Sequence, residues 1–481
     1  MRVWWRIGGS LAAAGVLSFA LAAAGAETCA LEMKRLEPYR GGNRAEEMIY
    51  RYVHPQHFFM QIQEGREVGD DQQEKEFSDL VKKEPKEYNS KHPLKRVAQL
   101  GSDKFCFVID AKKPDSKSFD RLYFDLNHNG DLTDDEPIES SPKAVVPFAG
   151  PGQFPRVDLT IDADGKKVDY SLVVSAHGYF GDEYQYISAS LSAAAYRAGE
   201  ITLDGEKHRL VLLDFNSNGR FDDVVEIPSG VRMANDGVYA QAGDMLWVDP
   251  APQTGYGYWR VSSGEQQQYV STLLSVGGKF YDLEITPAGD KLTLTPSELP
   301  TGKVSNPNGK FCAVVYNDEG VFLKIHGGKD QPAPLPVGKW KLLEYTIDLT
   351  EQMQEETEEA KAEKPTGLLE AIAKAVMGIA EDASSGQPSY TLVAASGKST
   401  YKAVEVRKGK TAKMPFGPPY QPKVTVDYLH DDTAELGLEI VGSAGEVCQD
   451  LMVRGKQPSA PEFTIVTKDG EKVTSGSFKY G

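Results

Sequence analysis

Residues 125–136 carry oxygen-bearing side chains at a regular spacing. Gly130, at the sixth position of this segment, permits a sharp turn, and such a turn brings every second residue toward one centre. Calcium prefers six to eight hard oxygen ligands, so this spacing suits it. The segment therefore predicts a calcium site closed by Glu136 or by Asp134. In order along the chain, the candidate ligands are Asp125, Asn127, Asn129, Asp131 (through its backbone carbonyl), Asp134 and Glu136.

A second copy of the pattern begins at Asp214 and has its glycine at Gly219. Its twelfth position is Val225, so the closing carboxylate must come from Asp222, Asp223 or Glu226. Both copies have an aspartate at position 10, which could be the common last ligand in place of Glu136. The candidate ligands of the second copy are Asp214, Asn216, Asn218, Arg220 (through its backbone carbonyl), Asp222 and Asp223.

The two loops resemble the calcium-binding loops of EF-hand, dockerin and thrombospondin type-3 repeats over about a dozen residues each. The resemblance does not extend to the flanking elements, because apolar strand-like segments precede both loops and Pro137 follows the first. A dockerin would also place its two loops close together. The resemblance implies calcium as a cofactor that stabilises the fold. The alternative is a pair of Asn-Gly turns that bind nothing.

The elements that position these loops are predicted to be β-strands. Apolar and polar residues alternate along the chain, as in Val157 to Ile161 and Val168 to Val174, which Asp164-Gly165 joins into a hairpin. Asp204-Gly205 and Asp469-Gly470 predict two further hairpins. The fold class expected is mainly β, with several antiparallel β-sandwich or open-barrel domains in tandem and one helical insertion.

Composition shifts give the expected domains. Residues 1–26 are read as a signal peptide, because a basic start and an apolar run lead to the small-x-small pattern Ala24-Gly25-Ala26. An uncleaved anchor is the alternative. The expected units are an N-terminal β domain (27–150) and a second β domain (151–300), each with one calcium loop, a third β domain (301–420) with an acidic helical insertion at 351–385, and a final β unit (421–481).

Charge and cysteine usage fit an exported protein, periplasmic or extracellular. The formal net charge of −17 argues against binding nucleic acid phosphates. No segment after the expected cleavage site has the length and apolar character of a membrane span. Four cysteines allow two disulfides, or they are buried free thiols, since Cys106 and Cys312 lie in strand-like runs.

The C-terminal third shows a second resemblance. Residues 317–320 form a turn-like Asn-Asp-Glu-Gly, 335–340 read Leu-Pro-Val-Gly-Lys-Trp, and 404–409 read Val-Glu-Val-Arg-Lys-Gly. This region is similar to carboxypeptidase-regulatory-like and collagen-adhesin B-type β-sandwich domains. The resemblance implies a transthyretin-like module without catalytic activity. The insertion at 351–385 departs from that pattern.

Two classes of function remain open. The favoured one is an exported, multi-domain, calcium-binding β-protein with a binding or surface-interaction role, whose candidate partners are a cell-surface protein or a polysaccharide. The alternative is an exported hydrolase that acts on polysaccharide, with calcium stabilising the fold. No G-x-S-x-G or H-E-x-x-H motif occurs, and no catalytic residue can be assigned. Aromatic residues Trp247, Tyr256, Tyr258 and Trp259 could stack on sugar rings or belong to core strands.

Overall fold

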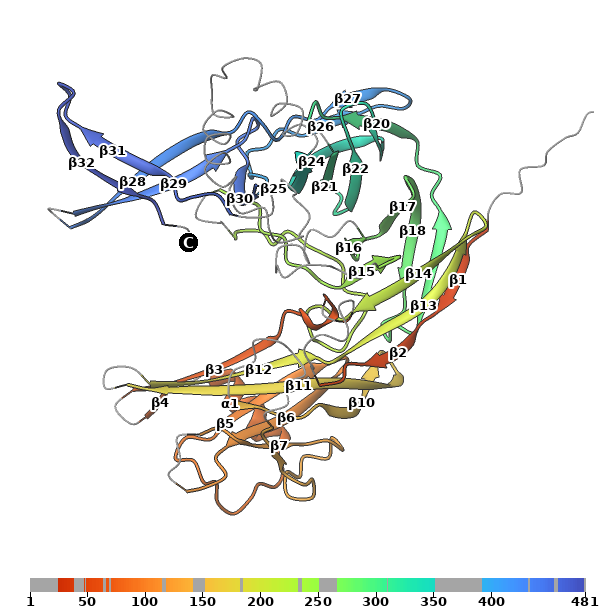
Figure 1. The fold of residues 1–481 in the computed structure, drawn as a ribbon. Helices are drawn as coiled ribbons and strands as arrows, with labels where there is room; N and C mark the ends of the chain where they lie inside the picture. Colours follow the sequence, from red (N-terminus) through yellow and green to blue (C-terminus); the bar gives the residue numbers. More distant parts are fainter. Residues whose placement is uncertain are drawn as a thin grey trace, which may run out of the picture.

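The computed structural model describes most of the chain, and its elements are almost all β-strands (Figure 1). Among the described residues, no helix is long and apolar enough to cross a membrane. The expected signal peptide lies almost wholly outside this part of the chain, and the insertion expected at 351–385 lies entirely outside it. The described residues are 25–38, 47, 49–63, 66–68, 71–114, 118–141, 152–181, 185–231, 236–250, 266–308, 310–350, 392–430, 433–453 and 457–479.

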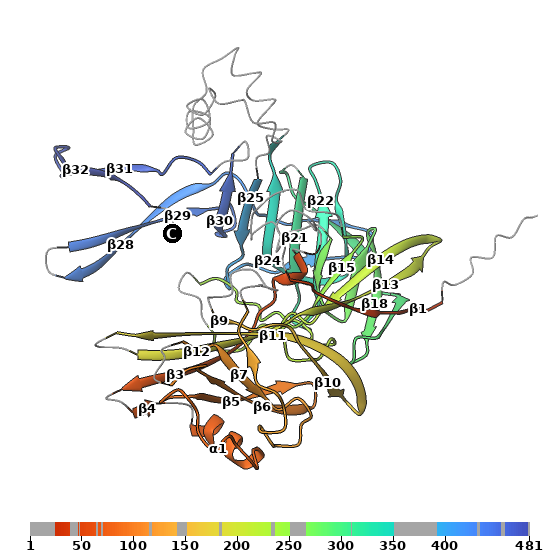
Figure 2. The ribbon, with the colours of Figure 1, turned by 60° about the horizontal axis from the view of Figure 1, so that its bottom comes forward.

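Two sheets and a helix form the first layered unit. Phe58 of one sheet meets Phe107 of the other with ring centroids 5.0 Å apart, and helix α1 (Asp71–Leu80) buries Phe77 against the outer face of the second sheet (Figure 2). The first sheet runs in the order β10 (Val157–Ala163), β11 (Lys166–Phe180), β12 (Gln185–Ala193), β3 (Gln56–Gln63), β4 (Arg66–Val68), with β9 (Gly152–Gln153) on β11. The second is β5 (Leu94–Leu100), β6 (Asp103–Asp110), β7 (Arg121–Phe124), β8 (Ile138–Glu139).

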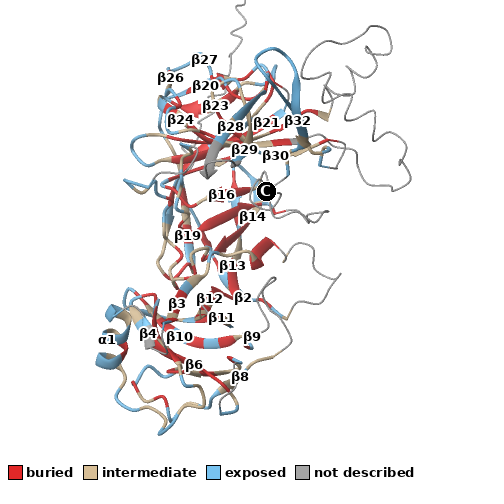
Figure 3. Ribbon diagram, turned by 90° about the vertical axis from the view of Figure 1, so that its left-hand side faces the viewer, coloured by how far each residue is buried: buried red, intermediate tan, exposed pale blue. Residues whose placement is uncertain are grey.

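A second pair of sheets continues the same hydrophobic core. Leu210 and Leu246 pack in one cluster with Leu283 and Leu292 of the facing sheet, and Figure 3 shows buried residues along these strands. A short 3-10 helix, η1 (Ile49–Arg51), lies between β2 and β3 in the chain. One sheet is β16 (Gln267–Tyr269), β15 (Met245–Val248), β14 (Glu206–Leu213), β13 (Ala195–Leu203), β2 (Glu32–Arg35); the other is β1 (Glu27–Ala30), β19 (Lys291–Pro296), β18 (Lys279–Ile285), β17 (Leu273–Val276).

The C-terminal sheets enclose a separate core around Trp340. This side chain is 1% exposed, and its Nε1 donates a hydrogen bond of 2.8 Å to the Pro336 carbonyl. The smaller sheet is β23 (Ala333–Pro336), β20 (Thr301–Ser305), β27 (Thr411–Lys413). The larger is β22 (Phe322–Gly327), β21 (Lys310–Tyr316), β24 (Gly338–Asp348), β25 (Leu392–Ser396), β30 (Val447–Met452), β29 (Thr433–Val441), β28 (Gln421–His430), with β26 (Val404–Val406) on β24; β31 (Glu462–Val466) and β32 (Lys472–Ser477) form a hairpin.

Strand pairing confirms the expected fold class, a mainly β chain with several antiparallel sheets in tandem. Among the described strands, only β20 and β27 pair in parallel. The Asp164-Gly165 and Asp204-Gly205 turns join β10 to β11 and β13 to β14 as expected, because both residues of each turn adopt the positive φ that tight hairpins require. Asp469-Gly470 joins β31 to β32.

The pairings also run across the boundaries expected between domains. β1 pairs with β19, β2 with β13 and β3 with both β12 and β4, so residues 27–68 complete sheets that are otherwise built from residues 152–296. In the same way, β28, β29 and β30 extend the sheet of β21, β24 and β25.

All four cysteines lie in the described part of the chain and are free thiols. Cys29, Cys106 and Cys312 are buried, and Cys448 is partly buried. Burial raises the pKa of the Cys106 thiol to about 12. The alternative of buried free thiols is therefore the one observed, because the cysteines belong to the packed strands that their apolar neighbours predict.

Candidate metal-binding loops

Each candidate loop begins at the end of a strand and is held by a neighbouring segment. The first follows β7, and its Gly130 carbonyl accepts a hydrogen bond of 2.8 Å from the Lys82 amide, just beyond helix α1. The second follows β14, and its Asn218 carbonyl accepts one of 2.7 Å from the Gly101 amide in the turn between β5 and β6. Packed elements on two sides therefore fix the backbone of each loop.

The first aspartate of each loop is buried and organises the turn. Asp125 is 2% exposed and accepts hydrogen bonds from the amides of Asn129 (3.0 Å) and Gly130 (2.8 Å). Asp214 is 0% exposed and accepts the equivalent bonds from Asn218 (3.1 Å) and Gly219 (2.7 Å). The same positions of the two loops thus make the same contacts.

The amide side chains converge on the aspartate at position 10. In the first loop, Asn127 and Asn129 donate through Nδ2 to Asp134 Oδ2, at 3.3 and 2.7 Å. In the second loop, the corresponding bonds join Asn216 and Asn218 to Asp223 Oδ2, at 3.1 and 2.7 Å. Positions 1, 3, 5 and 10 therefore gather in both loops, which favours position 10 over position 12 for the closing carboxylate.

The glycine at position 6 is required in both loops. Gly130 and Gly219 have φ values of +80° and +82°, in the left-handed region that glycine adopts without strain. A Cβ on Gly130 would lie 2.6 Å from the Leu80 carbonyl oxygen, and one on Gly219 would lie 2.6 Å from the Gly101 amide nitrogen. Glycine is therefore required at position 6 for two reasons: the turn needs a positive φ, and a second segment leaves no space for a Cβ.

Four of the predicted site residues have side chains that lie away from these clusters or are held by other partners. Asp131 pairs with Lys83 Nζ at 2.8 Å, and this hydrogen bond, together with one from Thr133, lowers its pKa to about 2. Arg220 pairs with Asp222 at 2.9 Å. Asp131 and Arg220 can therefore contribute only the backbone carbonyls that the spacing predicts. Glu136 is exposed at the end of the first loop.

The structure adds residues that the spacing did not predict. Asp244 accepts hydrogen bonds from the amides of Phe215 (3.1 Å) and Asp223 (2.9 Å) in the second loop. In the first loop, Asp135 makes the contact equivalent to that between Asp244 and Phe215, because it accepts a hydrogen bond of 2.9 Å from the Leu126 amide. Position 11 of the second loop is Val224, so a residue from a distant segment replaces the missing carboxylate. No local spacing in the sequence marks Asp244.

Buried carboxylates give the second loop an unusual electrostatic character. Burial raises the pKa of Asp214 to about 7, although hydrogen bonds from the Tyr170 hydroxyl (2.7 Å) and two backbone amides lower it. Burial, and then repulsion from Asp214 and Asp223, also raises the pKa of Asp244 well above its ordinary value. The charges that raise these two pKa values most belong to other aspartates, so a cation would relieve their repulsion.

The donor set distinguishes between kinds of metal. Within the described residues, no group of three or more His, Cys, Asp or Glu side chains is arranged to hold a metal ion. Each loop offers two carboxylates, two amide oxygens and backbone carbonyls instead. Hard oxygen donors of this kind suit calcium and do not suit zinc or copper, which prefer imidazole and thiolate ligands.

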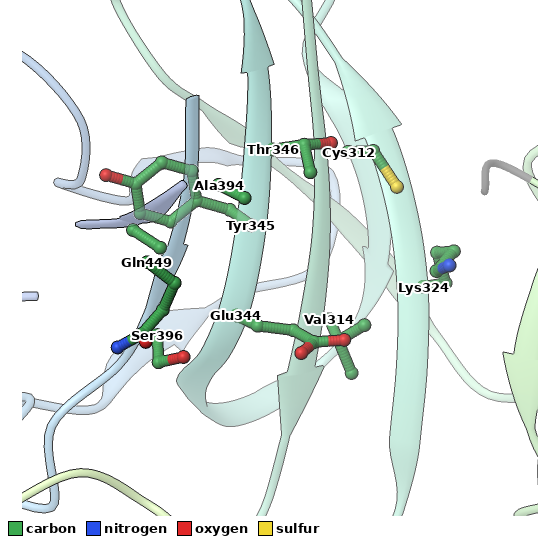
Figure 4. A pocket seen from close by; sticks show the side chains of 10 residues that line it. Cys312, Val314, Lys324, Glu344, Tyr345, Thr346, Ala394, Ser396 and Gln449 are labelled. Atoms are coloured by element: carbon green, nitrogen blue, oxygen red, sulfur yellow. The ribbon is translucent and has the colours of Figure 1, made fainter. Parts of the chain in front are cut away.

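A pocket on the larger C-terminal sheet does not make a comparable site (Figure 4). Cys312, Lys324 and Glu344 from three adjacent strands contribute to its lining. Burial raises the pKa of Glu344, and the nearby Lys324 lowers it. The cavity measures about 70 Å³, which is far below the ~300 Å³ at which small-molecule sites begin. We therefore assign it no ligand.

No protein-family model matches the chain, and no curated protein or solved structure is significantly similar to it. The class of protein is therefore defined by the fold itself, a multi-domain β-protein built from tandem antiparallel sheets.

Proposed function

We propose that this chain is an exported, multi-domain β-protein that binds one calcium ion in each of its two loops and serves a binding or surface-interaction role. The observation that carries the calcium assignment is the repetition of one arrangement at two places in the chain. Both loops bring the side chains of positions 1, 3, 5 and 10 together. In the second loop, other aspartates exert the strongest repulsion on the buried Asp214 and Asp244 among the described residues.

The residues that would hold the ion are Asp125, Asn127, Asn129 and Asp134 in the first loop. In the second they are Asp214, Asn216, Asn218 and Asp223. Bound calcium would neutralise carboxylates that now lie close to one another and would cross-link the loop backbone. Its role is structural, because sheets and not a pair of movable helices flank the loops.

A calcium titration of metal-free protein tests this assignment. We expect two ions per chain, and one ion in each of Asp125→Ala and Asp214→Ala, because each variant removes the carboxylate around which its loop turns. Arg220→Ala is the matched control and should still bind two ions, since position 7 supplies only a backbone carbonyl. Binding that is unchanged in both aspartate variants, or absent from the wild type, would reject the assignment.

Export predicts a specific mature N-terminus. When the chain is produced with its full leader in a secreting host, mass spectrometry of the processed protein should show an N-terminus at Glu27. Ala26→Leu should block this processing, because signal peptidase needs a small residue before the cut. An exported chain that still carries residues 1–26 would instead support the uncleaved anchor.

A further inference from the structure

One face of the first sheet carries a row of exposed aromatic side chains, here called the aromatic face. Its rings are Phe59 on β3, Tyr186 on β12 and Tyr179 on β11. Phe59 is 47% exposed and Tyr179 53% exposed, whereas most large apolar side chains of this sheet are buried. Exposed aromatic side chains that cluster on one surface mark a place of interaction more often than singly scattered ones do.

Strand register places these residues on the same side of the sheet. Tyr186 lies opposite Tyr179 on one neighbouring strand and opposite Gln61 on the other. Ser188 lies opposite His177 and Phe59 in the next row. Because side chains alternate along a strand, the residues between them point to the other face, where Phe58, Met60 and Ile187 belong to the core.

The rings form a continuous strip in which the planes of neighbouring rings are nearly parallel and stack on one another. Phe59 and Tyr186 have ring centroids 5.4 Å apart and an interplanar angle of 27°, and Tyr186 and Tyr179 are 6.0 Å apart at 26°. The His177 ring meets Tyr186 edge-on at 5.8 Å. The strip crosses three strands, and no described strand packs over it (Figures 1 and 2).

Polar groups beside the strip are neutral. Gln61, Ser188 and Ser190 contribute an amide and two hydroxyls, and Ser190 hydrogen-bonds His57 Nδ1 at 3.1 Å. Burial, and then the nearby His54, lowers the pKa of His57, so this imidazole is uncharged at neutral pH. The described side chains of these central rows therefore offer aromatic surface and uncharged hydrogen-bonding groups.

We propose that the aromatic face binds a neutral polysaccharide. A sugar ring has an apolar C–H face that stacks on an aromatic ring, and hydroxyls at its edge that bond amides, hydroxyls and imidazoles. The net charge of −17 repels polyanions, and the neutral rows provide no compensating ion pairs for them. This inference rests on the proposed binding role and names its partner.

Affinity electrophoresis in native gels tests the proposal. The gels contain hydroxyethylcellulose or galactomannan as neutral polymers, or alginate as the anionic comparison. We expect at least one neutral polymer to retard the calcium-loaded protein, and alginate not to. Tyr179→Ala and Tyr186→Ala should each weaken binding at least about tenfold, the size expected for losing one stacking ring. Tyr179→Phe should retain binding because it keeps the ring.

The control is Tyr239→Ala, which removes an aromatic side chain that is 40% exposed but lies outside the aromatic face. It should bind as the wild type does. The proposal is wrong if neither neutral polymer retards the protein, or if the Tyr179 and Tyr186 variants bind normally. Self-association that both variants abolish in sedimentation would assign the face to a second copy of the chain. Release of reducing ends would assign hydrolysis instead of simple binding. Each of these results leaves the calcium stoichiometry independently measurable.

Discussion

Adding about 10 mM calcium to the metal-free protein is expected to raise its melting temperature by about 3–10 °C for each occupied loop. With dissociation constants of about 0.1–1 mM, typical of extracellular calcium modules, linkage adds about 1.4–2.7 kcal/mol per site. For a unit of ~150–250 residues, 1 kcal/mol corresponds to about 2–4 °C. Differential scanning calorimetry with calcium and then with chelator measures the shift.

Matched substitutions identify the closing carboxylate of each loop. Asp134→Asn should remove the shift that the first loop contributes, because the side-chain amides of that loop converge on Asp134. Glu136→Gln should keep this shift. In the second loop, Asp223→Asn should remove the shift and Asp222→Asn should keep it, since Arg220 holds Asp222. The reverse pattern would restore position 12 in the first loop and would contradict the geometry described above. A wild type that shows no shift would make the loops plain Asn-Gly turns.

The stability of the metal-free protein is expected to fall as the pH rises from about 4 to about 7. The pKa of Asp214 is raised from its ordinary value of 3.8 to about 7 in the folded chain, chiefly by burial. In that window the folded state holds a proton that the unfolded state has released. The contribution of the Asp214 carboxyl to the free energy of unfolding is therefore fully present below about pH 4. It is lost as the pH rises through the pKa of the folded state. The raised pKa of Asp244 acts in the same direction, and together they amount to a few kcal/mol.

Calcium should abolish most of this loss, because it stabilises the charged carboxylate. Urea unfolding at several pH values gives the free energy of unfolding as a function of pH. The slope of this dependence is compared with and without calcium. Asp214→Asn should flatten the profile of the metal-free protein, since an amide does not titrate. Asp169→Asn changes an exposed carboxylate that pairs with Arg35. This control variant should show the same pH dependence of stability between pH 4 and 7 as the wild type. Stability that rises with pH across this window in the metal-free wild type would contradict the buried, protonated state of Asp214.

Local features were predicted well from the sequence. The alternation of apolar residues predicted the strands on either side of Asp164-Gly165, and the turn residues predicted how they join, because both depend on neighbours a few positions away. The clustering of loop positions 1, 3, 5 and 10 also follows from local spacing, since a tight turn gathers residues that are close in sequence.

Features that depend on distant segments were not predicted. The apolar strand around Val211 pairs with β15 and β13, but its pattern does not say which partners it has. The aromatic face is a further example. The sequence offered Trp247 and Trp259 as candidate stacking residues, but Trp247 is 2% exposed in β15 and Trp259 lies outside the described residues. No local pattern marks Phe59, Tyr179 and Tyr186, because only the pairing of three strands brings them into one row.

The β class, the hairpins and the repeated oxygen spacing follow from the amino-acid sequence alone, because they depend on a period of two residues and on turns of a few residues. The folded chain was needed to show that Asp134 and Asp223, and not Glu136, accept hydrogen bonds from the amide side chains. The folded chain also places Asp244 against the second loop and buries the Asp214 carboxylate away from solvent. Burial and distant contacts set these properties, since the energy of a carboxylate depends on whatever surrounds it in space.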